Sequence, residues 1–155
     1  MRNHLISVML AVLASSTAAQ SQEITTCRNP SGKAYFHFSG QLSKDASGWV
    51  DDKISDGVFT LTQGADGSVD ILYVDIYKKP ISTVADGGLV RVLRRSDTSV
   101  MIIVLYSSST EIYTFFKEKD GGSRFTLFQG RSNAVISKSS LLQGNCDSIR
   151  FDLLK

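Results

Sequence analysis

The stretch from Thr98 to Gln129 constrains the fold of this chain more than any other. It contains three apolar runs separated by two turn sequences, and the first run, VMIIVLY at 100–106, has no polar interruption. A run this short, rich in Val and Ile and bordered by Ser and Thr, favours a β-strand over a helix. Because a half-exposed strand would alternate apolar and polar residues, we expect both faces of this strand to be covered.

The two turn sequences indicate that the three runs form consecutive hairpins. Ser107–Ser109 follows the first run, and an Asp-Gly pair within 119–122 separates the second run from the third. Asp-Gly accommodates the positive φ angles of tight hairpin turns. Alternation along the second run places Glu111, Tyr113 and Phe115 on one face. The stretch therefore predicts a three-stranded antiparallel meander.

The rest of the chain continues this pattern of short strands and turns. Further strands are expected at 33–38, 57–63, 68–77, 81–84, 89–95 and 149–153. Residues 20–27 are expected to be loose, 28–32 to form a turn, and 134–142 to form a strand or a short helix. No crossover helix is evident, which argues against parallel βαβ packing. The predicted fold class is all-β, an antiparallel meander forming a single barrel or sandwich of about 8–10 short strands.

The first 19 residues have the pattern of a secretory signal peptide. Arg2 supplies the positive start, Leu5–Ala14 the apolar centre, and Ser15–Ala19 a small-residue cleavage region. The apolar centre is too short to span a bilayer, and no later segment is long enough. A buried N-terminal helix is the alternative. We therefore expect a signal peptide at 1–19, a single β domain at 20–155, and export to the periplasm or beyond.

The two cysteines, Cys27 and Cys146, lie near opposite ends of the predicted domain. An even pair in an oxidising compartment predicts a disulfide, with two free thiols as the alternative. The bridge would hold the N-terminal segment of the domain beside the C-terminal one.

The nearly equal numbers of basic and acidic residues limit which classes of binding partner are expected. The chain has 17 basic and 15 acidic residues, and one of the basic residues, Arg2, lies in the predicted signal peptide. Nucleic-acid binders usually carry a clear basic excess, so we expect no nucleic-acid partner. Five basic residues flank one part of the chain and are candidates for binding an anionic partner: Lys78, Lys79, Arg91, Arg94 and Arg95. The competing interpretation is that they are solvated strand ends that discourage edge pairing.

No set of catalytic or metal-binding residues stands out. The predicted domain has one histidine, His37, and lacks a G-x-S-x-G nucleophile motif. Its three glutamates do not suggest a glycosidase pair. The acidic sequence from Asp66 to Asp70 is similar to a calcium-binding loop, but a hairpin turn explains its Asp-Gly pair without an ion. We therefore predict no catalytic residue, metal or cofactor, and favour binding over catalysis.

Aromatic residues are the remaining candidates for ligand binding. Trp49 lies in an irregular polar stretch, which we expect it to anchor onto the core, with an exposed contact residue as the alternative. The aromatic residues on the predicted strands belong either to the core or to a cavity for a small apolar ligand. They are Tyr73, Tyr77, Tyr106, Tyr113, Phe115 and Phe116.

Several short sequences together resemble a group of small exported bacterial all-β proteins of uncharacterised function. They are Cys27 with Pro30-Ser31-Gly32, Gly48-Trp49, Asp86-Gly87-Gly88, Glu111–Phe115 and Gly144-Asn145-Cys146. The resemblance covers nearly all of the predicted domain and implies a shared fold and export route, but no activity. The missing catalytic motifs favour a non-enzymatic module that binds an unknown protein, in the manner of an inhibitor, or a small ligand. A barrel for an apolar ligand, a hydrolase and a structural envelope component are the alternatives.

Overall fold

A computed structural model describes residues 21–74, 78–132 and 134–154. Within these ranges, ten β-strands and two short 3-10 turns are present, and there is no α-helix. The all-β fold class and its expected number of strands are therefore confirmed. The described part of the chain includes no helix with the length and apolar character needed to cross a membrane. The predicted signal peptide and residues 75–77 of the predicted strand 68–77 lie outside the described residues.

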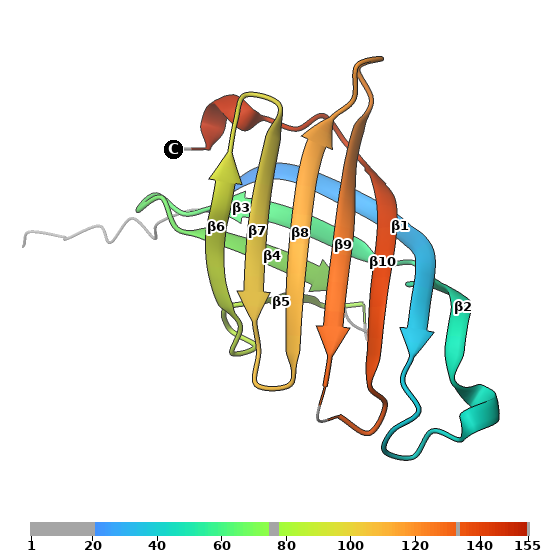
Figure 1. The fold of residues 1–155 in the computed structure, drawn as a ribbon. Coiled ribbons are helices and arrows are strands. Elements are labelled where there is room, and N and C mark those ends of the chain that lie inside the picture. The colour runs from blue at the N-terminus through green and yellow to red at the C-terminus, as the bar shows by residue number, and fades with distance from the viewer. Residues whose placement is uncertain (1–20, 75–77, 133, 155) are drawn as a thin grey trace, which may run out of the picture.

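The strands pair antiparallel into one sheet that curls into a half-barrel (Figure 1). Nine strands follow the order β5-β4-β3-β1-β10-β9-β8-β7-β6, and β2 pairs with β1 beside this path. The strands are β1 (Gln22–Phe36), β2 (Gly48–Lys53), β3 (Val58–Gln63), β4 (Val69–Val74), β5 (Pro80–Ser82), β6 (Leu89–Arg95), β7 (Ser99–Leu105), β8 (Ser109–Lys117), β9 (Ser123–Arg131) and β10 (Lys138–Cys146). The 3-10 turns are η1 (Lys44–Ala46) and η2 (Phe151–Leu153).

β1 is much longer than the sequence predicts and lies at the centre of the sheet. Its first half pairs with β3, its second half with β2, and β10 runs along its other side. The loose segment expected at 20–27 and the turn expected at 28–32 are therefore wrong. Asn29 adopts a φ of 52° where the register against β10 shifts, so the turn-forming residues make a bulge within a continuous strand. The last predicted strand, 149–153, is also wrong, because η2 occupies its end.

The core lies on the concave side of the sheet and is rich in aromatic rings. Phe125 is fully buried, and its ring centroid lies 5.5 Å from that of Phe59 and 5.8 Å from that of Phe115. Cys27 and Cys146 face each other in the β1–β10 ladder and form the predicted disulfide, with an S–S distance of 1.98 Å. The disulfide thus joins the first and last strands in the middle of the sheet.

The strands of the predicted meander are β7, β8 and β9, and their inward faces are mostly as expected. Glu111, Tyr113 and Phe115 of β8 point to the concave side and are buried, as alternation predicts. Both faces of β7 were expected to be covered, but only one face is fully buried. Val100, Ile102 and Val104 are buried, whereas the residues between them are partly exposed. A single curled sheet has one core face, so the convex side of β7 contacts solvent despite being apolar.

Candidate functional site

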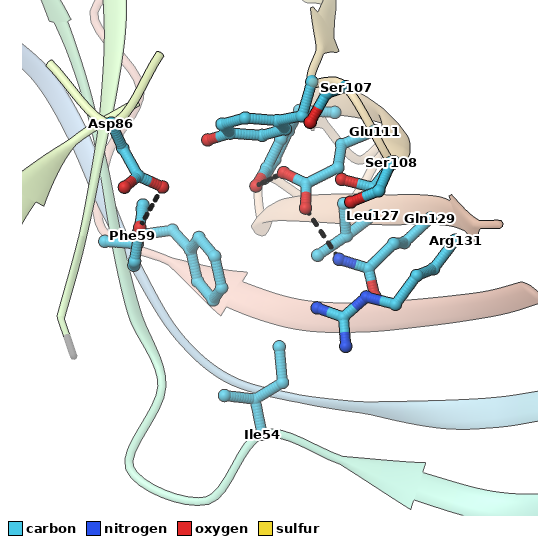
Figure 2. Close-up of a pocket in the computed structure, with 13 residues that line it drawn as sticks. Ile54, Phe59, Asp86, Ser107, Ser108, Glu111, Leu127, Gln129 and Arg131 are labelled. Carbon is cyan, nitrogen blue, oxygen red and sulfur yellow. Dashed lines mark hydrogen bonds between the residues drawn. The ribbon is translucent and has the colours of Figure 1, made fainter. Parts of the chain in front are cut away.

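A cleft of about 380 Å³ opens at one end of the half-barrel. Its walls come from the beginnings of β3 and β8, the end of β4 and the second half of β9, together with the turn between β7 and β8 and other nearby turns. Neighbouring antiparallel strands begin and end beside one another, so residues distant in the sequence meet there. Figure 2 shows the lining residues, which are Ile54, Phe59, Tyr73, Asp86, Tyr106–Ser109, Glu111, Tyr113, Leu127, Gln129 and Arg131.

Glu111 is a buried carboxylate in the wall of this cleft, with 9% of the residue exposed. The β8–β9 register places Gln129 directly opposite Glu111, and Tyr113 follows two residues later on the same face. Gln129 Nε2 donates to Glu111 Oε1 at 2.6 Å, and the Tyr113 hydroxyl donates to Oε2 at 2.7 Å (Figure 2). Within the described ranges, no basic side chain forms an ion pair with this carboxylate.

A second carboxylate, Asp86, lines the cleft from the turn between β5 and β6 (Figure 2). Gly87 follows it with a φ of 87°, a conformation that favours glycine and sets the direction of the turn. The Tyr73 hydroxyl, from the end of β4, donates to Asp86 Oδ2 at 2.7 Å. Unlike Glu111, Asp86 is exposed, so it forms part of the rim.

Two tyrosines of the cleft are held in their neutral form. Burial raises the pKa of Tyr106 above its ordinary value, and the negative charge of Glu111 raises it further. Burial, the charge of Glu111 and the hydrogen bond to Glu111 also raise the pKa of Tyr113. Both phenols therefore stay protonated near neutral pH, where they offer hydrogen bonds and carry no charge.

The lining combines acceptor groups with aromatic walls. Glu111 and Asp86 accept hydrogen bonds, and Arg131, exposed at the end of β9, is the one basic residue among those lining the cleft. Aromatic faces attract cations, and carboxylates bind ammonium and guanidinium groups through charge-assisted hydrogen bonds. The arrangement therefore suits a ligand group with a positively charged nitrogen.

Trp49 lies apart from the cleft, on the convex face of β2. It is 71% exposed and is the cross-strand partner of Tyr35 on β1, with ring centroids 5.4 Å apart in an edge-to-face arrangement. The expectation that Trp49 anchors its segment onto the core is therefore wrong. Its role as an exposed contact residue stays a hypothesis.

The five predicted basic residues fall into two groups rather than one patch. Lys78 forms an ion pair with Asp56 at 3.1 Å, close to where β3 begins, and Lys79 is next in the chain. Arg94 and Arg95 line a groove together with the last residue of β3. Arg91 lies on the same strand, β6. The length of β3 thus separates the lysines from Arg94 and Arg95.

Of the residues considered for catalysis or calcium binding, Glu111 lines the cleft, whereas His37 and the acidic sequence from Asp66 to Asp70 do not. His37 Nε2 lies 3.2 Å from Ser139 Oγ, just beyond the end of β1. The hydroxyl and backbone N–H of Ser68 donate to Asp66 and lower the pKa of that carboxyl. Asp70 accepts hydrogen bonds from the hydroxyls of Ser82 and Thr83. In the part of the chain that the structure describes, no group of three or more His, Cys, Asp or Glu residues is placed to hold a metal ion.

Comparison with protein-family models, with curated proteins and with solved structures finds no match for this chain. The resemblance to small exported bacterial proteins therefore stays a prediction. The cleft was missed by reasoning from the sequence, although one signal was present. Glu111 is an acidic residue on the face of a strand that it shares with Tyr113 and Phe115, where an apolar residue would be ordinary.

Proposed function

We propose that this protein is an exported, non-enzymatic binding module whose cleft holds a positively charged nitrogen group of a small ligand. The ammonium or guanidinium group would lie against Glu111, with the aromatic walls around it. The observation that carries this proposal is the environment of Glu111, a carboxylate that is buried, lines a cleft, and has two neutral hydrogen-bond donors but no basic ion-pair partner among the described residues.

The free-energy cost of burying the Glu111 carboxylate favours a ligand with a positive charge. Removing an ionised carboxylate from water costs several kcal/mol, and buried charges are therefore usually paired with an opposite charge. The donors from Tyr113 and Gln129 offset part of this cost. A ligand cation would offset more of it, so a charged ligand should bind better than a neutral ligand of the same shape.

Export is supported by two independent features. The first 19 residues have the composition of a signal peptide, and the Cys27–Cys146 disulfide is typical of proteins in an oxidising compartment. Binding rather than catalysis is supported by the lining itself. Its two carboxylates are held by Tyr73, Tyr113 and Gln129, and fixed acceptors of this kind suit recognition of a donor group.

Calorimetric titration with three ring compounds of similar shape tests this proposal. Benzylammonium is positively charged, benzyl alcohol is neutral and benzoate is negatively charged. We expect benzylammonium to bind most tightly, and Glu111→Gln to weaken its binding by about tenfold or more, which corresponds to roughly 1.4 kcal/mol. Equal binding of the three compounds would overturn the proposal.

Glu118→Gln is the matched control for this experiment. Glu118 follows the other end of β8, where it forms an ion pair with Arg124 at 2.7 Å, and it does not line the cleft. The control makes the same chemical change, so it should leave the affinity for benzylammonium unchanged. An equal loss of affinity in both variants would show that overall charge, and not the cleft, governs binding.

A further inference from the structure

We propose that the open edge at β6 is a docking site for an extended acidic segment of a partner protein, which adds to the sheet as one more strand. This surface lies outside the cleft, and the proposal does not depend on the proposed ligand. It rests on the free edge of β6, on the orientation of its arginines, and on the groove beside it.

β6 is the more open of the two ends of the nine-strand path, and β2, which lies off this path and pairs with β1, is a further edge strand. Among the described strands, β6 pairs with β7 alone, and no hydrogen-bonded ladder joins it to β4 across the opening of the half-barrel (Figure 1). At the other end, β5 has three residues and begins with Pro80, which has no backbone N–H. Short strands and proline are common protections of a sheet edge. β6 has seven residues and no proline, so it can offer backbone groups to another strand.

A bulge places two of the arginines of β6 on the same side. Arg91 pairs with Ile103 and Arg94 with Met101, and Leu93 between them is the extra residue. Met101 and Ile103 alternate with the buried residues of β7, so Arg91 and Arg94 share the convex face. A strand added beside β6 would therefore place two of its side chains, two residues apart in its sequence and on the convex face of the sheet, next to Arg91 and Arg94.

The charge of this edge selects an acidic partner. Arg91, Arg94 and Arg95 form no ion pair with a carboxylate in the described ranges. The guanidinium group of arginine binds carboxylates through two parallel hydrogen bonds, which favours acidic side chains in the added strand. A second copy of this chain would place arginines near arginines, and like charges across a strand pair are destabilising.

The groove beside β6 defines the other face of the partner strand. It has a volume of about 340 Å³ and lies between the end of β6 and the β3–β4 turn. Val69, Val92, Val100 and Leu154 form its apolar part, and Gln63, Arg94 and Arg95 also line it. Val92 pairs with the buried Ile102, so it points to the concave side. An added strand would turn its apolar side chains toward the apolar part of this groove, beside Val92, and its acidic ones toward Arg91 and Arg94. The expected partner segment therefore alternates acidic and apolar residues.

Three capped, fluorescently labelled peptides of seven residues test this proposal by fluorescence anisotropy. The first alternates Val and Glu, the second has the same composition with its Glu residues grouped at one end, and the third replaces one central Val of the alternating peptide by Pro. We expect the alternating peptide to bind with a Kd below about 1 mM and the other two to bind at least about tenfold more weakly. The grouped peptide keeps the charge but loses the two-residue spacing, and the proline removes a backbone donor.

Variants of the protein separate strand addition from general charge attraction. R91Q/R94Q should weaken binding of the alternating peptide about tenfold or more, since it removes both arginines of the convex face. K117Q/K119Q removes the same charge at and just beyond the end of β8, two strands away from β6 in the sheet, and should change the affinity less than about twofold. Amides of β6 should also become protected from hydrogen exchange when the peptide binds.

Several results would overturn the proposal. They are equal binding of the three peptides, absence of binding by the alternating peptide at about 1 mM, or equal effects of the two double variants. A stable dimer of the protein that is dissociated by R91Q/R94Q would also overturn it, because the edge would then pair with a second copy. None of these results bears on the binding of benzylammonium in the cleft.

Discussion

Removal of the Cys27–Cys146 disulfide is expected to lower the free energy of unfolding by about 4–5 kcal/mol. The two cysteines are 119 residues apart in the sequence, and closing a loop of that size restricts the unfolded chain by this amount in the chain-entropy model. In the folded state, Cys27 and Cys146 are already direct partners in the β1–β10 ladder. Loss of the covalent bond should therefore act mainly on the unfolded chain and leave the sheet intact.

Urea denaturation of C27A/C146A, followed by circular dichroism, measures this effect. Alanine is chosen because Cys27 is fully buried and serine would bury a hydroxyl group there. For a slope of about 2 kcal/mol per molar urea, the midpoint should fall by roughly 2 M relative to the oxidised protein. A shift below about 0.5 M with an unchanged slope would contradict this prediction, because it would mean that the bridge hardly restricts the unfolded chain.

The remaining predictions concern the core and the buried tyrosines. Phe125→Ala should lower the free energy of unfolding by about 3–5 kcal/mol in the same urea assay, because Phe125 is fully buried among aromatic rings. Phe128→Ala, at a neighbouring position that is 44% exposed, should cost less than about 1 kcal/mol, and equal losses would contradict the assignment of the two faces of β9. The raised pKa values of Tyr106 and Tyr113 mean that folding favours their protonated forms, so this stabilisation is present below pH about 10 and is lost as the pH rises through the higher pKa values of the folded state. Phenolate absorbance should show that Tyr106 and Tyr113 stay protonated above pH about 10, whereas ionisation of both near pH 10 would contradict the burial of these groups.

The hairpins between Thr98 and Gln129 could be predicted because their signals are local. Alternation along β8 identifies its buried face, and Gly121, in the predicted Asp-Gly turn, has the positive φ of 92° expected there. The class of fold and the disulfide were also predictable, from the spacing of the turns and from the number of cysteines.

The course of β1 was not predictable from local signals. Asn29-Pro30 is a common turn sequence, and it forms a bulge here because β1 pairs with strands on both sides. The strands that hold β1 extended are distant in the sequence. The exposure of Trp49 has a similar cause, since it depends on the register between β1 and β2.

The cleft could not be predicted from the sequence, because its lining residues come together only when distant strands pair. Glu111 meets Gln129 through the β8–β9 register, and Tyr73 meets Asp86 only after the chain has turned through β5. A carboxylate within an apolar pattern marks a position where the usual core is interrupted. It does not reveal which donors surround it or whether a cleft lies beside it.

A nuclear magnetic resonance titration with benzylammonium tests whether the cleft beside Glu111 is the binding site, because it locates the bound ligand on the protein. The amide signals that shift most should be those of Tyr106–Ser109, Glu111 and Gln129, and these shifts should be strongly reduced in Glu111→Gln. Shifts centred on Trp49, or no saturable shift in these residues, would contradict the claim that the cleft beside Glu111 is the binding site.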